Sequence, residues 1–105
     1  MLKKKYRLNL SAKLESPTFF RTPFFTLLVS KNNLPYNRYG YIASKKNSKK
    51  AVERNRAKRV FRALVEKENI KEGFDMLFIL KKEAFEKESG LSENIQETLR
   101  KAKFI

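Results

Sequence analysis

The residues whose type and spacing could do chemistry are the cations between Ser44 and Arg62. This stretch holds nine basic residues and one acidic residue, Glu53, so it carries +8 of the formal net charge of +14. One sign of charge at this density calls for an anionic partner that relieves the repulsion. The basic residues of the stretch are Lys45, Lys46, Lys49, Lys50, Arg54, Arg56, Lys58, Arg59 and Arg62.

The same stretch has helical periodicity from about Lys49. Apolar residues recur there at spacings of three and four, namely Ala57, Val60, Phe61 and Leu64. At about 100° per residue, a polar row falls on the opposite side, namely Asn55, Lys58, Arg59 and Arg62, with Arg54 and Arg56 at its edges. Arginine can bind phosphate through two parallel hydrogen bonds, and asparagine can read base or sugar edges. Because soluble surface helices interleave both signs of charge, the pattern favours nucleic-acid binding over a merely solvated helix.

Residues suited to catalysis are missing from the chain. It has no histidine and no cysteine, which removes the commonest general base, thiolate nucleophiles and Cys-type zinc sites. Its closest carboxylates, Glu83, Glu86 and Glu88, alternate with lysines and read as a solvated face. No glycine-rich phosphate loop, aspartate cluster or zinc spacing is present. We therefore predict no catalytic residue and no metal ligand in the protein itself.

Length and composition bound the remaining possibilities. With 105 residues we expect one domain over 1–105. The pI near 10.2 again indicates an acidic partner. No apolar run approaches the ~18 residues of a membrane span, and the basic start lacks the apolar segment of a secretory signal. The lack of cysteine fits a reducing compartment. We expect a cytoplasmic protein that needs neither a membrane nor a protein partner.

The elements that must position the basic row can be read in outline. We expect a short helix over 11–16, strands over 24–30 and 36–44, a helix over 49–69, a strand over 74–80, a helical turn over 81–89 and a helix over 92–103 capped by Ser92. The turn residues from Asn32 to Pro35 predict that the first two strands are antiparallel neighbours. The continuous apolar run 74–80 predicts a central strand covered on both faces.

Aromatic residues on the strands allow two interpretations. Phe25, Leu27 and Val29 share one strand face and are expected in the core, whereas Phe24, with Phe19 or Phe20, could form an exposed surface on which bases stack. Tyr39 and Tyr41 share a face of the next strand. These tyrosines fit an RNA-binding surface or the amphipathic cover of a core edge equally well.

The ordered pattern of the basic stretch carries a family resemblance. The residues SKK, a short spacer and AVxRNRxKRxxR resemble the signature of the protein subunit of bacterial ribonuclease P. The matching residues are Ser44, Lys45, Lys46, Ala51, Val52, Arg54, Asn55, Arg56, Lys58, Arg59 and Arg62. Softer similarity extends to Arg7 and Leu8, to FDMLFIL from Phe74 and to the basic C-terminal helix. The spacer is one residue longer than is typical of that family, and the segment from Leu14 to Phe24 is several residues shorter.

The resemblance implies a fold and a function. The fold would be α+β, a small two-layer sandwich with helices on a mainly antiparallel sheet and a left-handed strand–helix–strand crossover (ribosomal protein S5 domain 2-like). The function would be that of a non-catalytic protein cofactor in an endoribonuclease whose RNA subunit performs the chemistry with Mg²⁺ bound mainly by RNA. The implied partners are the ribonuclease P RNA and precursor tRNA, whose 5′-end maturation the protein would promote.

The resemblance also assigns residues. It implies RNA contacts for Lys45, Lys46, Lys49, Lys50, Arg54, Asn55, Arg56, Lys58, Arg59 and Arg62. It further implies a cleft for the single-stranded 5′ leader between a sheet face and the first helix. The candidate cleft residues are Leu14, Phe24, Leu28, Tyr39 and Tyr41.

Two other classes of function share parts of this pattern. A small ribosomal or other structural RNA-binding protein has the same size and charge but no reason for the RNR pattern. A DNA-binding or membrane-surface protein is less well supported. The sequence shows neither a helix-turn-helix nor a dimer seam, and the apolar helix face is needed for the core.

Overall fold

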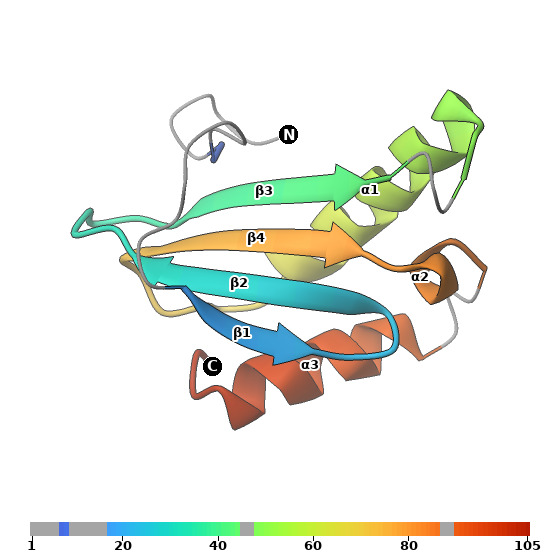
Figure 1. The fold of residues 1–105 in the computed structure, drawn as a ribbon. Helices are drawn as coiled ribbons and strands as arrows, with labels where there is room; N and C mark the ends of the chain where they lie inside the picture. Colours follow the sequence, from blue (N-terminus) through green and yellow to red (C-terminus); the bar gives the residue numbers. More distant parts are fainter. Residues whose placement is uncertain (1–6, 9–16, 45–47, 87–89) are drawn as a thin grey trace.

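The protein is described from a computed structural model, which describes residues 7–8, 17–44, 48–86 and 90–105. Four strands and three helices follow one another along this part of the chain (Figure 1). They are β1 (Thr18–Arg21), β2 (Phe25–Lys31), β3 (Arg38–Ala43), α1 (Ala51–Glu66), β4 (Phe74–Leu80), α2 (Lys82–Glu86) and α3 (Leu91–Lys101). The helix predicted over 11–16 lies outside the described residues.

The strands form one sheet in the order β1-β2-β4-β3. β4 is antiparallel to β2 and parallel to β3, and β1 is antiparallel to β2. The prediction that β2 and β3 are direct neighbours was therefore wrong, because β4 lies between them. Strand propensity and turn residues reveal that the chain reverses direction, but they do not reveal that a later strand enters the gap. β1 was also not predicted as a separate strand.

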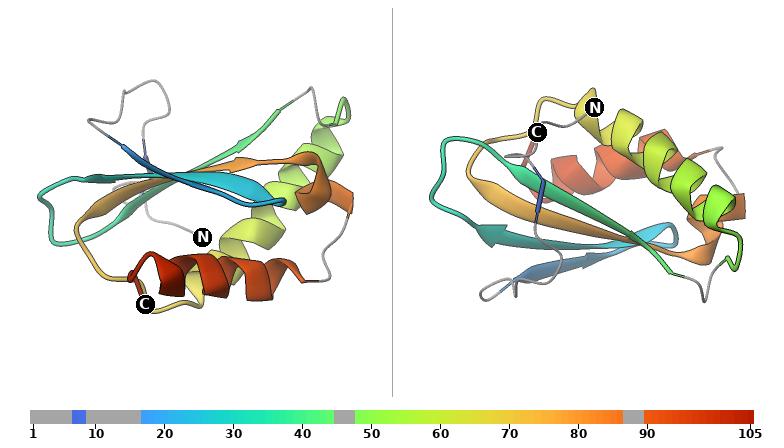
Figure 2. Two further views of the ribbon diagram at one scale, coloured as in Figure 1. Left: turned by 60° about the horizontal axis from the view of Figure 1, so that its bottom comes forward. Right: turned by 90° about the horizontal axis from the view of Figure 1, so that it is seen from above.

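The crossover from β3 through α1 to β4 is left-handed, as the resemblance implied. The two parallel strands are adjacent, and Figures 1 and 2 show α1 on the same side of the sheet as α3. Such units are right-handed in about 98% of cases, so local physics alone would have given the opposite hand. The fold is α+β in two layers, with a mostly antiparallel sheet under the helices.

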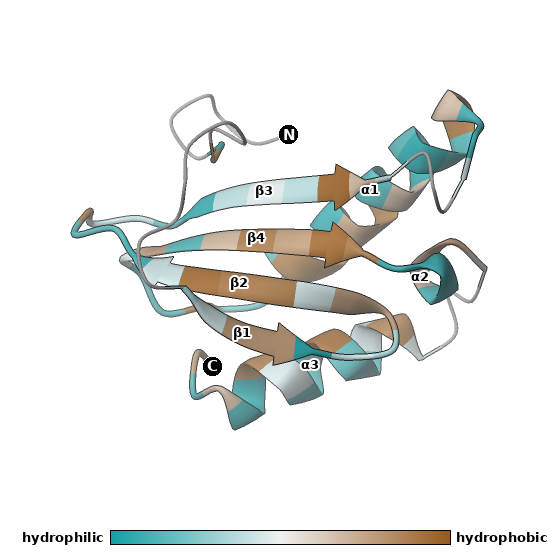
Figure 3. Cartoon of the chain, in the orientation of Figure 1, coloured by the Kyte–Doolittle hydropathy of each residue, from teal (hydrophilic) through white to brown (hydrophobic). Residues whose placement is uncertain are grey.

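The core lies between the sheet and the layer formed by α1 and α3. Its centre is a group of three aromatic rings in mutual contact, namely Phe25, Phe61 and Phe78, with centroid separations of 5.1–5.6 Å. Each of these rings is fully buried. Replacing such a residue by alanine costs about 3–5 kcal/mol, so this cluster fixes α1 to the sheet. Figure 3 shows the matching hydrophobic colouring along β2 and β4.

The two faces of the sheet differ in their cover. Met76, Phe78 and Leu80 of β4 point to the helices and are buried, whereas Leu77 and Ile79 alternate with them and are half-buried. β4 is a central strand, as predicted. The predicted cover on both faces is wrong for the described residues, because α1 and α3 both lie against one face. We call the opposite face the open face; it carries Phe19, Arg21, Thr26, Leu28, Gly40, Ile42, Leu77 and Ile79.

Two helix boundaries differ from the sequence predictions. α1 begins at Ala51 and ends at Glu66, which makes it shorter at both ends than the predicted range 49–69. α3 is capped by Gly90 and not by Ser92, which lies inside the first turn. Gly90 has φ of 84°, a left-handed conformation that glycine adopts without steric cost. Ala84 of α2 is buried in the core and Phe85 packs against it.

Candidate nucleic-acid interface

The basic row of α1 is held in place by the buried side of the same helix. Ala57, Phe61 and Val65 recur every four residues and are buried against the sheet and α3. The buried side of the helix is therefore turned slightly from the predicted apolar side, because Val60 and Leu64 are only half-buried whereas Val65 is buried. The helix spans 16 residues and is anchored over its last two and a half turns, so its outer side chains have a rigid base.

The predicted RNA-binding residues fall into three groups. Lys45 and Lys46 lie outside the described residues. Exposed side chains are those of Lys49, Lys50, Asn55, Arg56 and Arg59. Half-buried side chains are those of Arg54, Lys58 and Arg62, which recur every four residues and so form a second row beside the buried stripe. The structure thus replaces the single predicted strip with an outer surface and an inner row.

The inner row begins with a side chain that organises the start of the helix. Arg54 Nη1 donates a 2.9 Å hydrogen bond to the carbonyl oxygen of Ser48. The Ser48 hydroxyl donates to a Glu53 carboxylate oxygen at 2.6 Å. These contacts tie the segment before α1 to the helix, which holds Lys49 and Lys50 beside the outer surface of α1.

The inner row ends in a groove between α1 and β3. We call it the edge groove; its volume is about 260 Å³ and it is lined by Arg7, Leu8, Tyr39, Gly40, Tyr41, Lys58 and Arg62. Leu8, near the N-terminus, contributes to the lining of this groove. Its N–H donates a hydrogen bond to the Tyr39 carbonyl oxygen at 2.8 Å. Arg7 forms a parallel bridge with Tyr39. In the sequence, Arg7 is marked only by its softer similarity to the family.

Two polar atoms of the edge groove lack partners. The Tyr41 hydroxyl oxygen and Arg62 Nε are buried without a hydrogen bond in the part of the chain that the structure describes. The Arg62 guanidinium lies over the Tyr41 ring, with Cζ 5.6 Å from the ring centroid. A buried donor left unpaired costs about 1–3 kcal/mol. Burial also raises the pKa of the Tyr41 hydroxyl, so this group stays protonated and remains a donor.

The five residues predicted for a leader cleft do not share one surface. Leu14 lies outside the described residues, and Leu28 lies on the open face. Tyr39 and Tyr41 do share a face, but it is the face toward the helices, where Tyr41 stacks on Phe78 at 5.5 Å. Tyr41 is 6% exposed, so the structure selects amphipathic cover over an exposed stacking surface. Phe24 is half-buried and packs against the core.

An exposed aromatic does exist on the open face. Phe19 is 53% exposed, and Arg21 Cζ lies 5.8 Å from its ring centroid. Strand pairing aligns Phe19 with Leu28 and, through Leu28, with Leu77 of the central strand. Phe20 points the other way and contacts Phe104 at 6.0 Å. The alternation in β1 would have distinguished Phe19 from Phe20, had this strand been recognised in the sequence.

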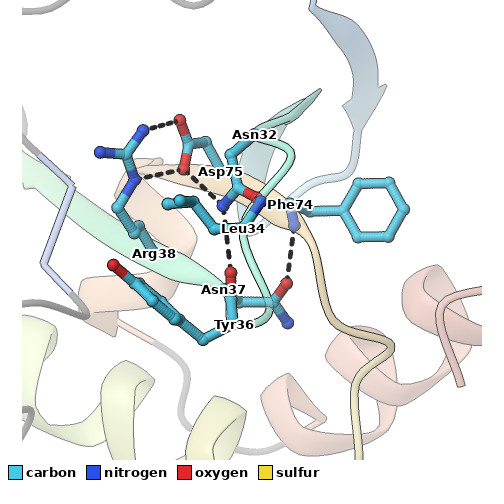
Figure 4. A network of polar contacts seen from close by, with 7 residues as sticks. All are labelled: Asn32, Leu34, Tyr36, Asn37, Arg38, Phe74 and Asp75. Carbon is cyan, nitrogen blue, oxygen red and sulfur yellow. Dashed lines mark hydrogen bonds and ion pairs between the residues drawn. The ribbon is translucent and has the colours of Figure 1, made fainter.

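A polar network fixes the loop that leads into β3 (Figure 4). Arg38 donates two hydrogen bonds of 2.7 Å to the carboxylate of Asp75, one from Nε and one from Nη2. Asn32 Nδ2 donates to the same carboxylate at 3.0 Å and to the Tyr36 carbonyl oxygen at 3.1 Å. Asn37 accepts from the Phe74 N–H at 2.8 Å. The network joins β3 to β4 at the end of the sheet where both strands begin.

This network also sets the ionisation of its carboxylate. Burial raises the pKa of the Asp75 carboxyl, but the hydrogen bonds from Arg38 and Asn32 and the charge of Arg38 outweigh burial. The pKa of Asp75 therefore lies below its ordinary value. Because every oxygen of this group is engaged by neighbours in the fold, its role is structural.

The described residues contain no group of three acidic, histidine or cysteine side chains that could hold a metal ion. Within the same residues, no helix combines the length and the apolar character needed to cross a membrane.

A family model described as Ribonuclease P matches residues 2–103. The chain belongs to the ribonuclease P protein family.

Relatives of the family support this assignment. A ribonuclease P protein component from Pseudoalteromonas translucida is 38% identical over 87 residues, which cover 81% of this chain and 56% of that protein. One from Dehalococcoides mccartyi is 42% identical over 62 residues, which cover 59% of this chain and 51% of that protein. The chain spans about half the length of these curated relatives.

Solved structures of the family share the fold. The RNase P protein from Thermotoga maritima superposes with a TM-score of 0.72 at 27% identity, covering 91% of this chain and 93% of that one. A Staphylococcus aureus RNase P protein mutant with defective mRNA degradation activity superposes with a TM-score of 0.83, covering 97% of this chain and 92% of that one. At 24% identity the latter shows the fold alone.

Proposed function

We propose that this chain is an RNA-binding protein cofactor of ribonuclease P. It binds the catalytic RNA through α1 and the 5′ leader of precursor tRNA on the open face, and it thereby promotes 5′-end maturation of tRNA. The RNA subunit carries the chemistry, and Mg²⁺ is bound mainly by that RNA. The protein acts in the cytoplasm as part of a ribonucleoprotein.

The observation that carries this proposal is the outer surface of α1. Asn55, Arg56 and Arg59 are exposed and lie away from the stripe that packs on the sheet. The fold does not need their charge to pack its core. A rigid helix that presents arginines beside an asparagine suits an RNA backbone, since planar guanidinium groups bind phosphate in pairs of hydrogen bonds.

Metal binding by the protein has no support in the described residues. Among the described residues, no three acidic side chains form a group that could hold a metal ion. The donors that Mg²⁺ prefers are several oxygens in an octahedral arrangement. In the proposed function, the protein itself therefore does not hold the ion.

The open face supplies the second half of the proposal. Its central rows are apolar, with Leu28, Leu77 and Ile79 half-buried, and Phe19 and Arg21 stand at one side. A single-stranded nucleic acid binds sequence-tolerantly where cations meet an exposed aromatic ring on which bases stack. This arrangement fits a leader whose sequence differs from one precursor to the next.

Reconstitution tests the proposed function. The purified chain is mixed with a bacterial ribonuclease P RNA, and cleavage of precursor tRNA is measured from low to high Mg²⁺. We expect strong stimulation at low Mg²⁺, where the RNA alone is slow, and no cleavage by the protein without RNA. Absence of stimulation at every Mg²⁺ concentration, with RNA that is active alone at high Mg²⁺, would contradict the proposal.

A further inference from the structure

The outer edge of β1 is free in the part of the chain that the structure describes. β1 lies at one end of the strand order, and no described strand pairs with its outer side. The opposite end of the sheet differs, because Arg7 bridges to Tyr39 on β3 and the Leu8 N–H donates to the Tyr39 carbonyl oxygen. A free edge presents unpaired backbone N–H and C=O groups, which are a template for another strand.

The pairing of β1 with β2 shows which backbone groups point outward. The Thr22 N–H donates to the Phe25 carbonyl oxygen at 2.9 Å. In an antiparallel ladder, hydrogen-bonded pairs alternate with pairs that are not hydrogen-bonded. Along the observed register, Phe20 therefore bonds to β2, whereas the N–H and C=O groups of Phe19 and Arg21 point away from the sheet.

Two prolines limit the length of this edge. Pro17 and Pro23 occupy the outward positions on either side of Phe19 and Arg21. Because proline has no backbone N–H, the donors of this edge are confined to Phe19 and Arg21. Such a boundary suits a short added segment and opposes the open-ended strand pairing that leads to aggregation.

A groove between this edge and α3 leaves room for the side chains of an added strand. We call it the β1 groove; its volume is about 460 Å³. Residues 19–23 form one wall, and Asn94, Glu97, Thr98 and Lys101 of α3 form the other. Figure 1 shows α3 beside β1 at this end of the sheet. Since side chains alternate along a strand, every second side chain of an added strand would enter the groove and the others would extend the open face.

The charges at this edge favour an acidic polypeptide over other occupants. Arg21 is exposed and forms no ion pair within the described residues, whereas Lys101 pairs with Glu97 at 2.8 Å. A second copy of the chain would bring another Arg21 and a formal net charge of +14 against the first, which opposes association. RNA phosphates would accept from the outward N–H groups but would also lie against the outward carbonyl oxygens. A polypeptide strand matches both kinds of group.

We propose that the outer edge of β1 binds an extended, acidic segment of a partner protein by strand addition. The segment forms backbone hydrogen bonds with Phe19 and Arg21 and places a carboxylate beside the Arg21 guanidinium. In strand addition the backbone supplies affinity, and alternate side chains supply specificity. The proposed function requires no protein partner, so this interaction is additional to it and either can fail without the other.

A synthetic peptide tests the backbone contacts. The probe is acetyl-Thr-Glu-Thr-Val-Thr-Glu-amide, whose second and fourth residues lie opposite Arg21 and Phe19 in antiparallel pairing. Amide hydrogen exchange of the full chain is followed by NMR. The peptide should protect the N–H groups of Phe19 and Arg21, whereas the Phe20 N–H, which faces β2, should exchange equally slowly with and without peptide.

N-methylated peptides supply the matched control for strand addition. Methylation of the second and fourth residues removes the N–H groups that face β1. Methylation of the third and fifth residues makes the same chemical change to N–H groups that face away. We expect the first peptide to bind more weakly by about two- to tenfold for each lost hydrogen bond, and the second to bind as the parent does.

Charge reversal tests the acidic character of the segment. Arg21→Glu should weaken binding of the peptide by about two- to fivefold and should favour the peptide in which lysine replaces glutamate. Arg100→Glu makes the same change in net charge on an exposed residue of α3 outside the β1 groove. It should retain the preference of the wild type for the glutamate peptide.

Three outcomes would overturn the proposal. Protection of the Phe19 and Arg21 N–H groups that rises with the concentration of the chain alone would assign the edge to a second copy. Protection by a single-stranded oligouridylate, and not by the peptide, would assign it to RNA. Absence of protection by the peptide, or equal binding of both N-methylated peptides, would exclude strand addition by an acidic segment.

Discussion

At the scale of single residues, the fold depends on one ion pair at the end of the sheet. The Arg38 side chain is 36% exposed and the Asp75 side chain 10% exposed, so the carboxylate is the buried partner. Its hydrogen bonds from Arg38 and Asn32 replace those it would make with water. Arg38 and Asn32 belong to opposite ends of the loop between β2 and β3, so Asp75 fixes both ends of that loop.

Asp75→Asn should lower the free energy of unfolding by about 1–3 kcal/mol near pH 7, because a paired charge becomes neutral while Arg38 stays in place. The cost should depend on pH. Since the folded pKa of Asp75 is depressed, its contribution is present above the unfolded pKa of about 3.9 and is lost as pH falls through the lower folded pKa. Urea unfolding from neutral pH into the acid range measures this.

The wild type and Asp75→Asn should therefore converge in stability at acid pH. Glu97→Gln supplies the control, since Glu97 and Lys101 form a 2.8 Å pair on the exposed side of α3. That pair is screened by solvent, and its loss should change stability little. A difference between wild type and Asp75→Asn that stays constant across the acid range would show that the ion pair does not stabilise the fold.

At the scale of elements, the sequence predicted which segments are regular better than it predicted how they pack. Helical spacing located α1, and the apolar run located β4 at its observed bounds, because both signals are local. The rotation of the α1 stripe was not predictable from spacing alone. Val60 and Val65 are equally apolar, and only the position of the helix over β3 and β4 decides which is buried.

For the candidate site too, the sequence located the residues but did not predict how they are arranged. The sequence identified the basic residues of α1 as a group, yet it could not separate the outer surface from the inner row. Arg59 and Arg62 are chemically identical in a sequence, and the neighbour that distinguishes them is Tyr41, which lies on a different element. Tyr41 faces the helices because of the way β3 pairs with β4 in the sheet. No local sequence pattern shows that β4 lies between β2 and β3.

Removing charge from the outer surface of α1 should weaken RNA binding without unfolding the protein. Arg56→Ala combined with Arg59→Ala changes two exposed residues, so the free energy of unfolding should move by no more than about 0.5 kcal/mol per site. The slope of log K against log salt should flatten by about 0.7 to 0.9 for each RNA phosphate that the variant no longer neutralises.

Arg100→Ala with Lys101→Ala removes the same charge from α3 and serves as the control for that double variant. It should leave the salt slope for ribonuclease P RNA close to that of the wild type, because neither residue belongs to the outer surface of α1 that is proposed to bind this RNA. Equal flattening in both double variants would mean that RNA responds to total charge and not to α1. A collapse of the melting temperature in the α1 variant would make those arginines structural.

At the scale of the whole molecule, the two faces of the sheet differ in their roles. Its covered face holds the core and positions α1, while its open face keeps apolar rows, an exposed Phe19 and the cation of Arg21 available. The inner row of α1 and the edge groove lie at the edge of the sheet formed by β3. Phe19 lies on β1, which forms the opposite edge of the same sheet. The two surfaces are thus separate, as the proposed binding of two RNA molecules requires.

This separation predicts that the contribution of the open face depends on the length of the 5′ leader. Binding of precursor tRNA is compared for substrates that differ only in leader length, using holoenzyme reconstituted with wild-type protein or with Phe19→Ala. Wild-type holoenzyme should bind the long-leader substrate more tightly than one with a single-nucleotide leader. Base stacking contributes about 1–3 kcal/mol per base, so Phe19→Ala should reduce the advantage of the long leader by about five- to a hundredfold.

Phe19→Leu, which keeps an apolar side chain without the ring, should lose most of the same advantage if stacking is the cause. Equal affinity of the wild-type holoenzyme for both leaders would leave the open face without a role in substrate binding, and the proposed RNA contacts of the described residues would then be confined to α1.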